Sequence, residues 1–262
     1  MGSILPERQE VPDSRAGGLV VLRGKVRDGA IHAEIPYAAI ADLLAEGRVV
    51  ILKGVFPPEE LLAYRRAVTH WRDETPPYPH GQSPNLTPDV NYHRADTGEI
   101  PSAIPHIFHQ YGFNTPGRLP DYVGLPTQRI AGLLLDLQNN VGGTQFDISL
   151  TGMRVKLLHY PVGGGFLQRH HHPLEPQRVG LIASLSRIGE DFRSGGTSFQ
   201  TRFGPVDTLR DHDIGDVILF RYDLPHEVLP VDEDEAIDWP ADTGKWSFVL
   251  DLRETHGLSQ TR

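Results

Sequence analysis

The sequence predicts a single, mainly β domain: a jelly roll supported by helices that precede it in the chain. After Gly152, short apolar segments alternate with turn residues, a spacing that is typical of a β-sandwich or barrel. Before Gly152, apolar residues recur at helical spacing. Helices followed by a run of strands favour one layered domain over residues 1–262, with 1–149 as the support and 150–262 as the jelly-roll core.

The chain is expected to begin with a hairpin and a short helix. Residues 19–36 contain two apolar segments around an Asp28-Gly29 turn, which is a strong hairpin signal. Residues 38–46 predict a short helix, and the apolar run 49–52 predicts a strand.

Two longer helices are expected next. The first begins at Pro57, because proline suits the first helical turn and Glu59 and Glu60 face the positive end of the helix dipole. The second covers residues 128–141 and ends at Gly142-Gly143. Their apolar faces should lie in the core: Leu61, Tyr64, Val68 and Trp71 in the first, and Ile130, Leu133, Leu134, Leu137 and Val141 in the second.

Residues 75–125 interrupt this regular pattern, because prolines recur and no period holds. A loop of this length inside a compact chain is either disordered or functional. Segment 104–114 is too aromatic for disorder, so we predict a folded lid that also recognises the substrate. The residues expected to contact the substrate are His93, Arg94, His106, His109 and Tyr111.

Composition excludes several classes of protein. The net charge of −9 opposes binding to nucleic acid or anionic membranes, since both need a basic face. No apolar segment approaches the roughly 20 residues of a membrane span, and we expect a protein of the cytoplasm. The chain has no cysteine, so any metal must be bound by His, Asp or Glu, which suits iron, manganese or zinc.

The segment FLQRHHHPLEPQ, residues 166–177, contains three consecutive histidines. On a strand, His170 and His172 would share one face while His171 points to the other. Two imidazoles at i and i+2 can bind one ion, and His226, which follows the apolar strand 217–220, is the candidate third ligand. The alternative places the pair in a surface loop and gives His226 a structural role.

Residues 150–253 resemble the 2-oxoglutarate and iron(II)-dependent dioxygenases. YPVGGGFLQRHHH is similar to the tyrosine, glycine-rich approach and FLxxHxD strand of that family, and GEDFRSGGTSF is similar to its GGxLxF turn and strand. GDVILF, HEVLPV and GKWSFVL follow in the order of its closing sequence. The resemblance implies a double-stranded β-helix, the cupin-like form of the jelly roll, with Fe(II) and 2-oxoglutarate as cofactors.

One ligand position departs from the family pattern. The His-x-Asp or His-x-Glu of the family falls on His170 and His172, so a histidine stands where a carboxylate is expected. We predict a metal centre of His170, His172 and His226. In the alternative, Glu175 swings in from the proline turn to replace His172. Halogenases of this superfamily carry a small residue at this position, so the imidazole argues against halogenation.

The resemblance also indicates where the cosubstrate binds. Lys245 in TGKWSF matches the basic residue that holds the distal carboxylate of 2-oxoglutarate in the prolyl-hydroxylase-like branch, and Arg253 is the second candidate. A buried ammonium needs an anion, which a dicarboxylate supplies. Arg154 and Lys156 share a strand face with Tyr160, so they could line the same pocket or face solvent.

The activity implied by the resemblance is hydroxylation of an unactivated C–H bond in a small molecule, amino-acid-like or a natural product, with release of succinate and CO2. Two alternatives stay open. A cupin-like three-histidine metalloenzyme would not use 2-oxoglutarate and would leave Lys245 without a role. A non-catalytic jelly-roll module would hold a structural ion and consume no oxygen.

Overall fold

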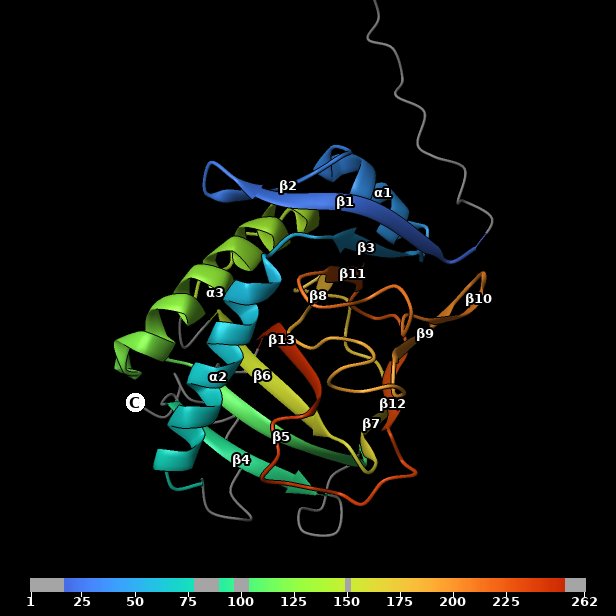
Figure 1. Ribbon diagram of the computed structural model, residues 1–262. Coiled ribbons are helices and arrows are strands. Elements are labelled where there is room, and N and C mark those ends of the chain that lie inside the picture. The colour runs from blue at the N-terminus through green and yellow to red at the C-terminus, as the bar shows by residue number, and fades with distance from the viewer. Residues whose placement is uncertain (1–16, 78–89, 97–103, 149–151, 253–262) are drawn as a thin grey trace, which may run out of the picture.

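The computed structural model describes residues 17–77, 90–96, 104–148 and 152–252, and the structural statements below refer to these. A long curved sheet is covered on one side by two helices, α2 (Pro58–Glu74) and α3 (Asp121–Gly142). Seen in Figure 1, these helices lie to the left of the strands, and the first elements of the chain lie above them. No helix within the described ranges is long and apolar enough to cross a membrane.

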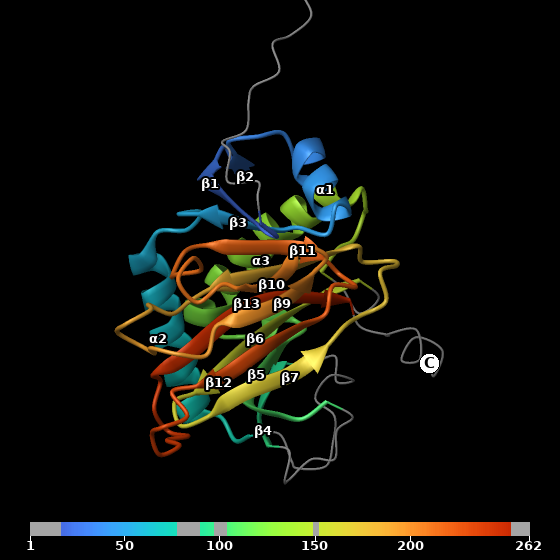
Figure 2. The ribbon, with the colours of Figure 1, turned by 90° about the vertical axis from the view of Figure 1, so that its right-hand side faces the viewer.

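The strands after residue 152 form a double-stranded β-helix, which confirms the predicted fold class. One layer runs β6-β13-β8-β11 and the other runs β7-β12-β9-β10, so successive strands alternate between the layers except at the β9–β10 hairpin. In Figure 2 the second layer is nearest the viewer and α3 lies behind the strands. The strands are β6 (Met153–Pro161), β7 (Gly165–His170), β8 (Val179–Ser184), β9 (Thr197–Thr201), β10 (Gly204–Asp207), β11 (Val217–Arg221), β12 (His226–Val231) and β13 (Gly244–Leu252).

The N-terminal hairpin extends the first of these layers. β1 (Leu19–Arg27) pairs antiparallel with β2 (Ala30–Ala33), and positive φ angles at Asp28 (51°) and Gly29 (78°) close the turn as predicted. The short helix α1 (Tyr37–Ala45) follows, and β3 (Val49–Lys53) then pairs with both β1 and β11. The hairpin, short helix and strand expected from the sequence are therefore confirmed.

Helices α2 and α3 pack their apolar faces on the outer face of β6 and β13. The core between them contains Tyr64 and Val68 from α2, Leu134 from α3, and Trp246 and Phe248 from β13. This burial is the main stabilising contribution to the layer, since it removes apolar area from water.

The predicted start of α3 at Gln128 is wrong, because the helix begins at Asp121 and includes Pro126. Proline removes one backbone hydrogen bond there. The next residue, Thr127, ties this part of the helix to α2, since its hydroxyl donates to the carbonyl of Val123 (2.7 Å) and accepts a hydrogen bond from the hydroxyl of Tyr64 (2.8 Å). The left-handed conformation at Gly143 ends the helix as predicted.

The prediction of a long loop that folds as a lid is wrong over two stretches. β4 (Val90–Asp96) and β5 (His106–Phe113) are strands of the sheet. β5 pairs with β6 and, at its start, with β7, so it joins the two layers. Residues 108–113 are buried on both faces. A strand covered on both sides shows no polar–apolar alternation, which is why the sequence pattern did not indicate it. Residues 78–89 and 97–103 of the expected lid lie outside the described residues.

Candidate metal centre

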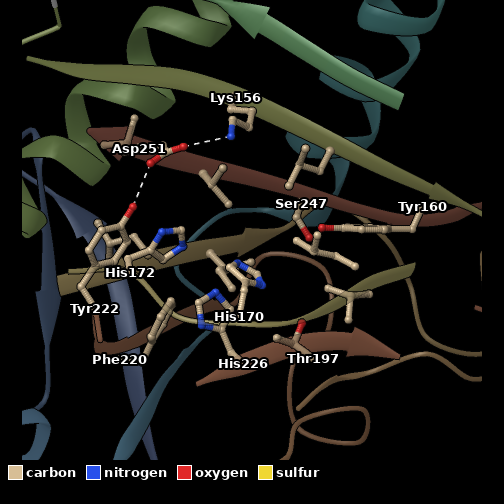
Figure 3. A pocket seen from close by; sticks show the side chains of 18 residues that line it. Lys156, Tyr160, His170, His172, Thr197, Phe220, Tyr222, His226, Ser247 and Asp251 are labelled. Atoms are coloured by element: carbon tan, nitrogen blue, oxygen red, sulfur yellow. Dashed lines mark hydrogen bonds and ion pairs between the residues drawn. The ribbon is translucent and has the colours of Figure 1, made fainter. Parts of the chain in front are cut away.

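A pocket lies inside the β-helix, between its two layers (Figure 3). Even-numbered residues of β6 and odd-numbered residues of β13 face this pocket, while their neighbours face the helices. Most of the wall is apolar, with Leu158, Ile182, Phe220, Val228 and Val249 among the lining residues. Apart from Ser247, the polar lining residues gather in three places, namely a histidine cluster, a hydroxyl pair and an ion pair with its tyrosine partner.

The histidine cluster consists of His170, His172 and His226, whose ligand atoms all lie within 4.8 Å of one another. His170 and His226 are directly opposed on the antiparallel strands β7 and β12. His172 lies two residues beyond the end of β7 and points to the same side as His170, whereas His171 is exposed. The alternation expected from the sequence thus brings together the three residues proposed as ligands, although the strand ends earlier than expected.

Hydrogen bonds fix the tautomers of two of these histidines. Nδ1 of His170 lies 2.9 Å from the carbonyl oxygen of Gln168, and Nδ1 of His226 lies 2.8 Å from that of Leu224. A carbonyl only accepts, so each Nδ1 carries the proton and each Nε2 keeps its lone pair. Both rings therefore present a nitrogen that is ready to bind a metal.

All three imidazoles are neutral at physiological pH. Burial lowers the pKa of His226 to about 3 and that of His172 to about 4, and it lowers the pKa of His170 as well. Neutral imidazole is the metal-binding form of histidine. The donor set therefore fits a divalent first-row transition metal.

The hydroxyl pair consists of Tyr160 and Thr197, which line the other end of the pocket. The Oγ1 atom of Thr197 is buried and has no hydrogen-bond partner within the described part of the chain. Tyr160 is buried, and burial raises the pKa of its phenol, so it is a hydrogen-bond donor. The sequence analysis missed Thr197, although its place in GGTSF, on the same strand face as Phe199, could have indicated it.

Lys245 lies beside this hydroxyl pair. It pairs across strands with Tyr160 on the same face of the layer, and it is only 2% exposed. Its Nζ lies 5.3 Å from the centre of the Phe192 ring, and it makes no hydrogen bond or ion pair with any described residue. Burial lowers the pKa of Lys245 to about 8, which leaves it mostly protonated at neutral pH. The charge of Asp207 acts on this ammonium and partly offsets the effect of burial, but no hydrogen bond or ion pair joins the two side chains. A buried ammonium that lacks a directly bonded anion favours binding of one.

Among the described residues, no arginine considered for the same role lies beside Lys245. Arg154 is buried opposite Asp251, six residues from Tyr160 along β6, a span of roughly 20 Å at the rise of an extended strand. The structure therefore does not bring it to the Lys245 end. Arg253 lies outside the described residues.

An ion pair that the sequence analysis missed forms the third polar part of the wall. Nζ of Lys156 donates to Asp251 over 2.9 Å, and the hydroxyl of Tyr222 donates to the same carboxylate over 2.8 Å (Figure 3). Alternation along β13 from Lys245 through Ser247 and Val249 would have placed Asp251 in the pocket. No local pattern indicates Tyr222, which follows the end of β11.

Glu175 does not join the histidine cluster. Its carboxylate accepts from the Nε atom of Arg178 at 3.0 Å, and both side chains are about half exposed or more, at 62% and 48%. The metal-ligand group that the described residues form contains three histidines and no carboxylate.

None of the five residues expected to contact the substrate lines the pocket formed by the described residues. Because β5 is a sheet strand, alternation directs His109 and Tyr111 to the face that the helices cover, where Tyr111 stacks on Trp246. Arg94 lies over Trp239 at 4.0 Å. The other two are His93, which is buried on β4, and His106, which stacks on Phe108.

No protein-family model and no curated protein sequence matches this chain. Solved structures do match. A Pseudomonas putida prolyl-4-hydroxylase superposes with a TM-score of 0.54 and 18% identity, over 83% of this chain and 99% of that one. The chain has the fold of the 2-oxoglutarate and iron(II)-dependent oxygenases. A rice dioxygenase for auxin oxidation gives a TM-score of 0.51 and 15% identity, over 83% and 77% of the two chains.

A third structure of this fold is a Trichoplax adhaerens prolyl hydroxylase in complex with a hypoxia inducible factor peptide fragment. It gives a TM-score of 0.50 and 12% identity, over 86% of this chain and 92% of that one. At such identities the similarity establishes the fold, and arguments about activity depend on the pocket itself.

Proposed function

We propose that this protein is an iron(II)- and 2-oxoglutarate-dependent oxygenase that hydroxylates an unactivated C–H bond of a small molecule and releases succinate and CO2. One observation carries the proposal. A single pocket is lined by a three-imidazole cluster, whose nitrogens can bind a metal, and by the hydroxyls of Tyr160 and Thr197. The buried Lys245 does not itself line the pocket but lies opposite Tyr160 on the neighbouring strand. The shared fold supports it.

We assign the metal to His170, His172 and His226. Their neutral rings provide nitrogen ligands, which suit iron(II), but the set is one negative charge short of two histidines and a carboxylate. Three protein ligands leave positions open for a chelating cosubstrate and for oxygen. Bound iron(II) would be the centre at which oxygen is reduced while 2-oxoglutarate is decarboxylated.

We assign the distal carboxylate of 2-oxoglutarate to Lys245, Tyr160 and Thr197. The ammonium and the two hydroxyls would each donate a hydrogen bond, and the one from Lys245 would be charge-assisted. The apolar wall around them keeps water away, which strengthens these interactions and protects reactive species from solvent.

The test is an anaerobic titration of iron(II) with and without 2-oxoglutarate, monitored by the metal-to-ligand charge-transfer band of the chelate. Wild-type protein should show the band, and Lys245→Met should weaken 2-oxoglutarate binding about ten- to a hundredfold, the equivalent of a charge-assisted bond of roughly 1.5–3 kcal/mol. Its iron affinity should not change, because Lys245 is not a ligand. Lys25→Met, a change at an exposed lysine of β1, is the matched control.

Other outcomes would replace the proposal. Iron binding without any response to 2-oxoglutarate would favour the cupin-like enzyme. A filled metal site with no oxygen consumption and no succinate would favour the non-catalytic module. Succinate formation with normal cosubstrate binding by Lys245→Met would keep the activity but move the carboxylate site away from Lys245.

A further inference from the structure

The three histidines of the cluster are not held in the same way. His170 and His226 lie on paired strands, and each ring is oriented by a hydrogen bond from Nδ1 to a backbone carbonyl. His172 lies beyond the end of β7 and makes no hydrogen bond with any described residue. Its orientation must have another cause.

That cause is a stacking contact. The ring of His172 lies parallel to the ring of Tyr222, with centroids 4.3 Å apart and an angle of 9° between the planes. Contact of this kind fixes the plane of the imidazole but occupies neither of its nitrogens, so both stay available. Figure 3 shows the two rings side by side at the pocket wall.

Tyr222 is itself fixed at both ends. Its hydroxyl donates to Asp251 over 2.8 Å, and Asp251 also accepts from Lys156 over 2.9 Å. Its backbone N–H donates to the carbonyl of Arg178 over 2.9 Å. The tyrosine is 8% exposed, so it is a rigid surface against which His172 can rest.

We propose that Tyr222, held by Asp251 and Lys156, is a positioning residue that orients His172 as the third metal ligand. Tyr222 orients the ring of His172, as backbone carbonyls orient the rings of His170 and His226. Partners that orient a ligand commonly change metal affinity ten- to a hundredfold when they are removed. This inference depends on the proposed metal site and adds to it the means by which a histidine outside the strand acts as a ligand.

The experiment is a titration of the metal-free protein with cobalt(II), whose visible d–d bands report on coordination geometry. Tyr222→Leu removes the stacked ring and should weaken cobalt(II) binding about tenfold and change the bands. Tyr222→Phe keeps the ring and loses the bond to Asp251, so a two- to fivefold loss is expected. The phenylalanine variant keeps the test decisive if the leucine variant folds poorly.

Two controls separate positioning from other effects. Tyr37→Leu removes a tyrosine outside the pocket whose hydroxyl donates to the carbonyl of Ile31, and it should leave cobalt(II) binding unchanged. Asp251→Asn removes the negative charge but keeps an oxygen that can accept from Tyr222. If Asp251→Asn lowers cobalt(II) affinity more than Tyr222→Leu does, the negative charge of Asp251 supports metal binding. That result would overturn the positioning role of Tyr222.

The two proposals fail in different ways. If the wild-type protein binds neither cobalt(II) nor iron(II), the metal site itself is wrong. If the wild-type protein binds cobalt(II) and both Tyr222 variants match it in affinity and spectrum, only the positioning role of Tyr222 is wrong.

Discussion

Histidines gather on both faces of the sheet, and the two groups use their ring nitrogens differently. The group in the pocket comes from β7, the residues just after it, and β12, and the group on the helix side comes from β5 and β6. On the pocket face, His170, His172 and His226 bring their ligand atoms within 4.8 Å of one another. On the helix-covered face, Nδ1 of His109 lies 3.2 Å from Nδ1 of His159. The second pair is covered by aromatic rings, since His159 stacks on Trp246 at 4.2 Å and 12°.

The helix-side pair uses its nitrogens within the protein. Nε2 of His159 lies 2.8 Å from the carbonyl oxygen of Thr243, so this nitrogen carries the proton. Nδ1 of His159 is then an acceptor, and His109 donates to it. Three of the four ring nitrogens therefore have a protein partner, which is the arrangement of a packed core.

Burial does not distinguish the two groups. It lowers the pKa of His109 to about 3, as it does for His226, and it lowers the pKa of His159 strongly. A depressed pKa thus marks a buried histidine whatever its role. The two groups differ in the partners of their ring nitrogens. In the pocket, the nitrogens of three rings converge on one point, whereas on the helix side most of them bond to protein atoms.

The largest expected effect is the loss of metal affinity when one histidine of the pocket group is replaced. His170→Ala or His172→Ala removes one of three ligands, and we expect metal affinity to fall more than about a hundredfold in a cobalt(II) or iron(II) titration. His171→Ala is the matched control, because this exposed side chain points away. Equal losses at positions 171 and 172 would show that the assignment of faces is wrong.

The same change on the helix side should affect folding instead. His159→Ala leaves a cavity beside Trp246 and a carbonyl at Thr243 without its donor, so we expect a loss of about 3 kcal/mol in the free energy of unfolding. Urea denaturation measures it. Metal affinity should stay within about twofold, and a large loss of affinity would mean that the two faces are coupled.

In the metal-free protein, buried histidines of both groups should make the free energy of unfolding fall as the pH is lowered. The unfolded pKa of histidine is near 6.5, whereas burial lowers the folded pKa of His226 and His109 to about 3. As the pH falls below 6.5, the unfolded chain binds protons that the folded chain excludes. The stability is therefore complete above pH 6.5 and is lost as the pH falls towards 3.

The expected size of this loss is about 1 kcal/mol for each such histidine between pH 7 and pH 5.5. Urea denaturation at both pH values measures it for wild type, His226→Leu and His109→Leu. Each variant should show a loss about 1 kcal/mol smaller than wild type. A smaller loss in only one of them would mean that the two histidines do not share the same degree of burial.

On the pocket side, much of the structure can be predicted from the sequence. The strands after residue 152 are short and separated by turns, and strand alternation places His170 and His172 on one side with His171 on the other. Lys245 could be predicted because it lies in a closing motif similar to that of a known family.

The helix side and the ion pair could not be predicted in this way. β4 and β5 lie within a stretch rich in proline, and β5 is buried on both faces, so the polar–apolar alternation of a strand is absent there. Asp251 and Tyr222 lie far apart along the chain and meet only because β13 and β11 both pair with β8. A contact that arises from the order of the strands in a sheet leaves no signal in a local sequence pattern.

The smallest expected effect concerns Glu175, the alternative third ligand. Its carboxylate pairs with Arg178 at the surface, where an ion pair contributes little, so Glu175→Gln should change the free energy of unfolding by at most about 0.5 kcal/mol. Metal affinity should stay within about twofold, as measured in the same titration as for His172→Ala. The two variants are reciprocal tests. If Glu175 were the ligand, its replacement would abolish binding while His172→Ala would be silent, and the metal centre would then be two histidines and a carboxylate.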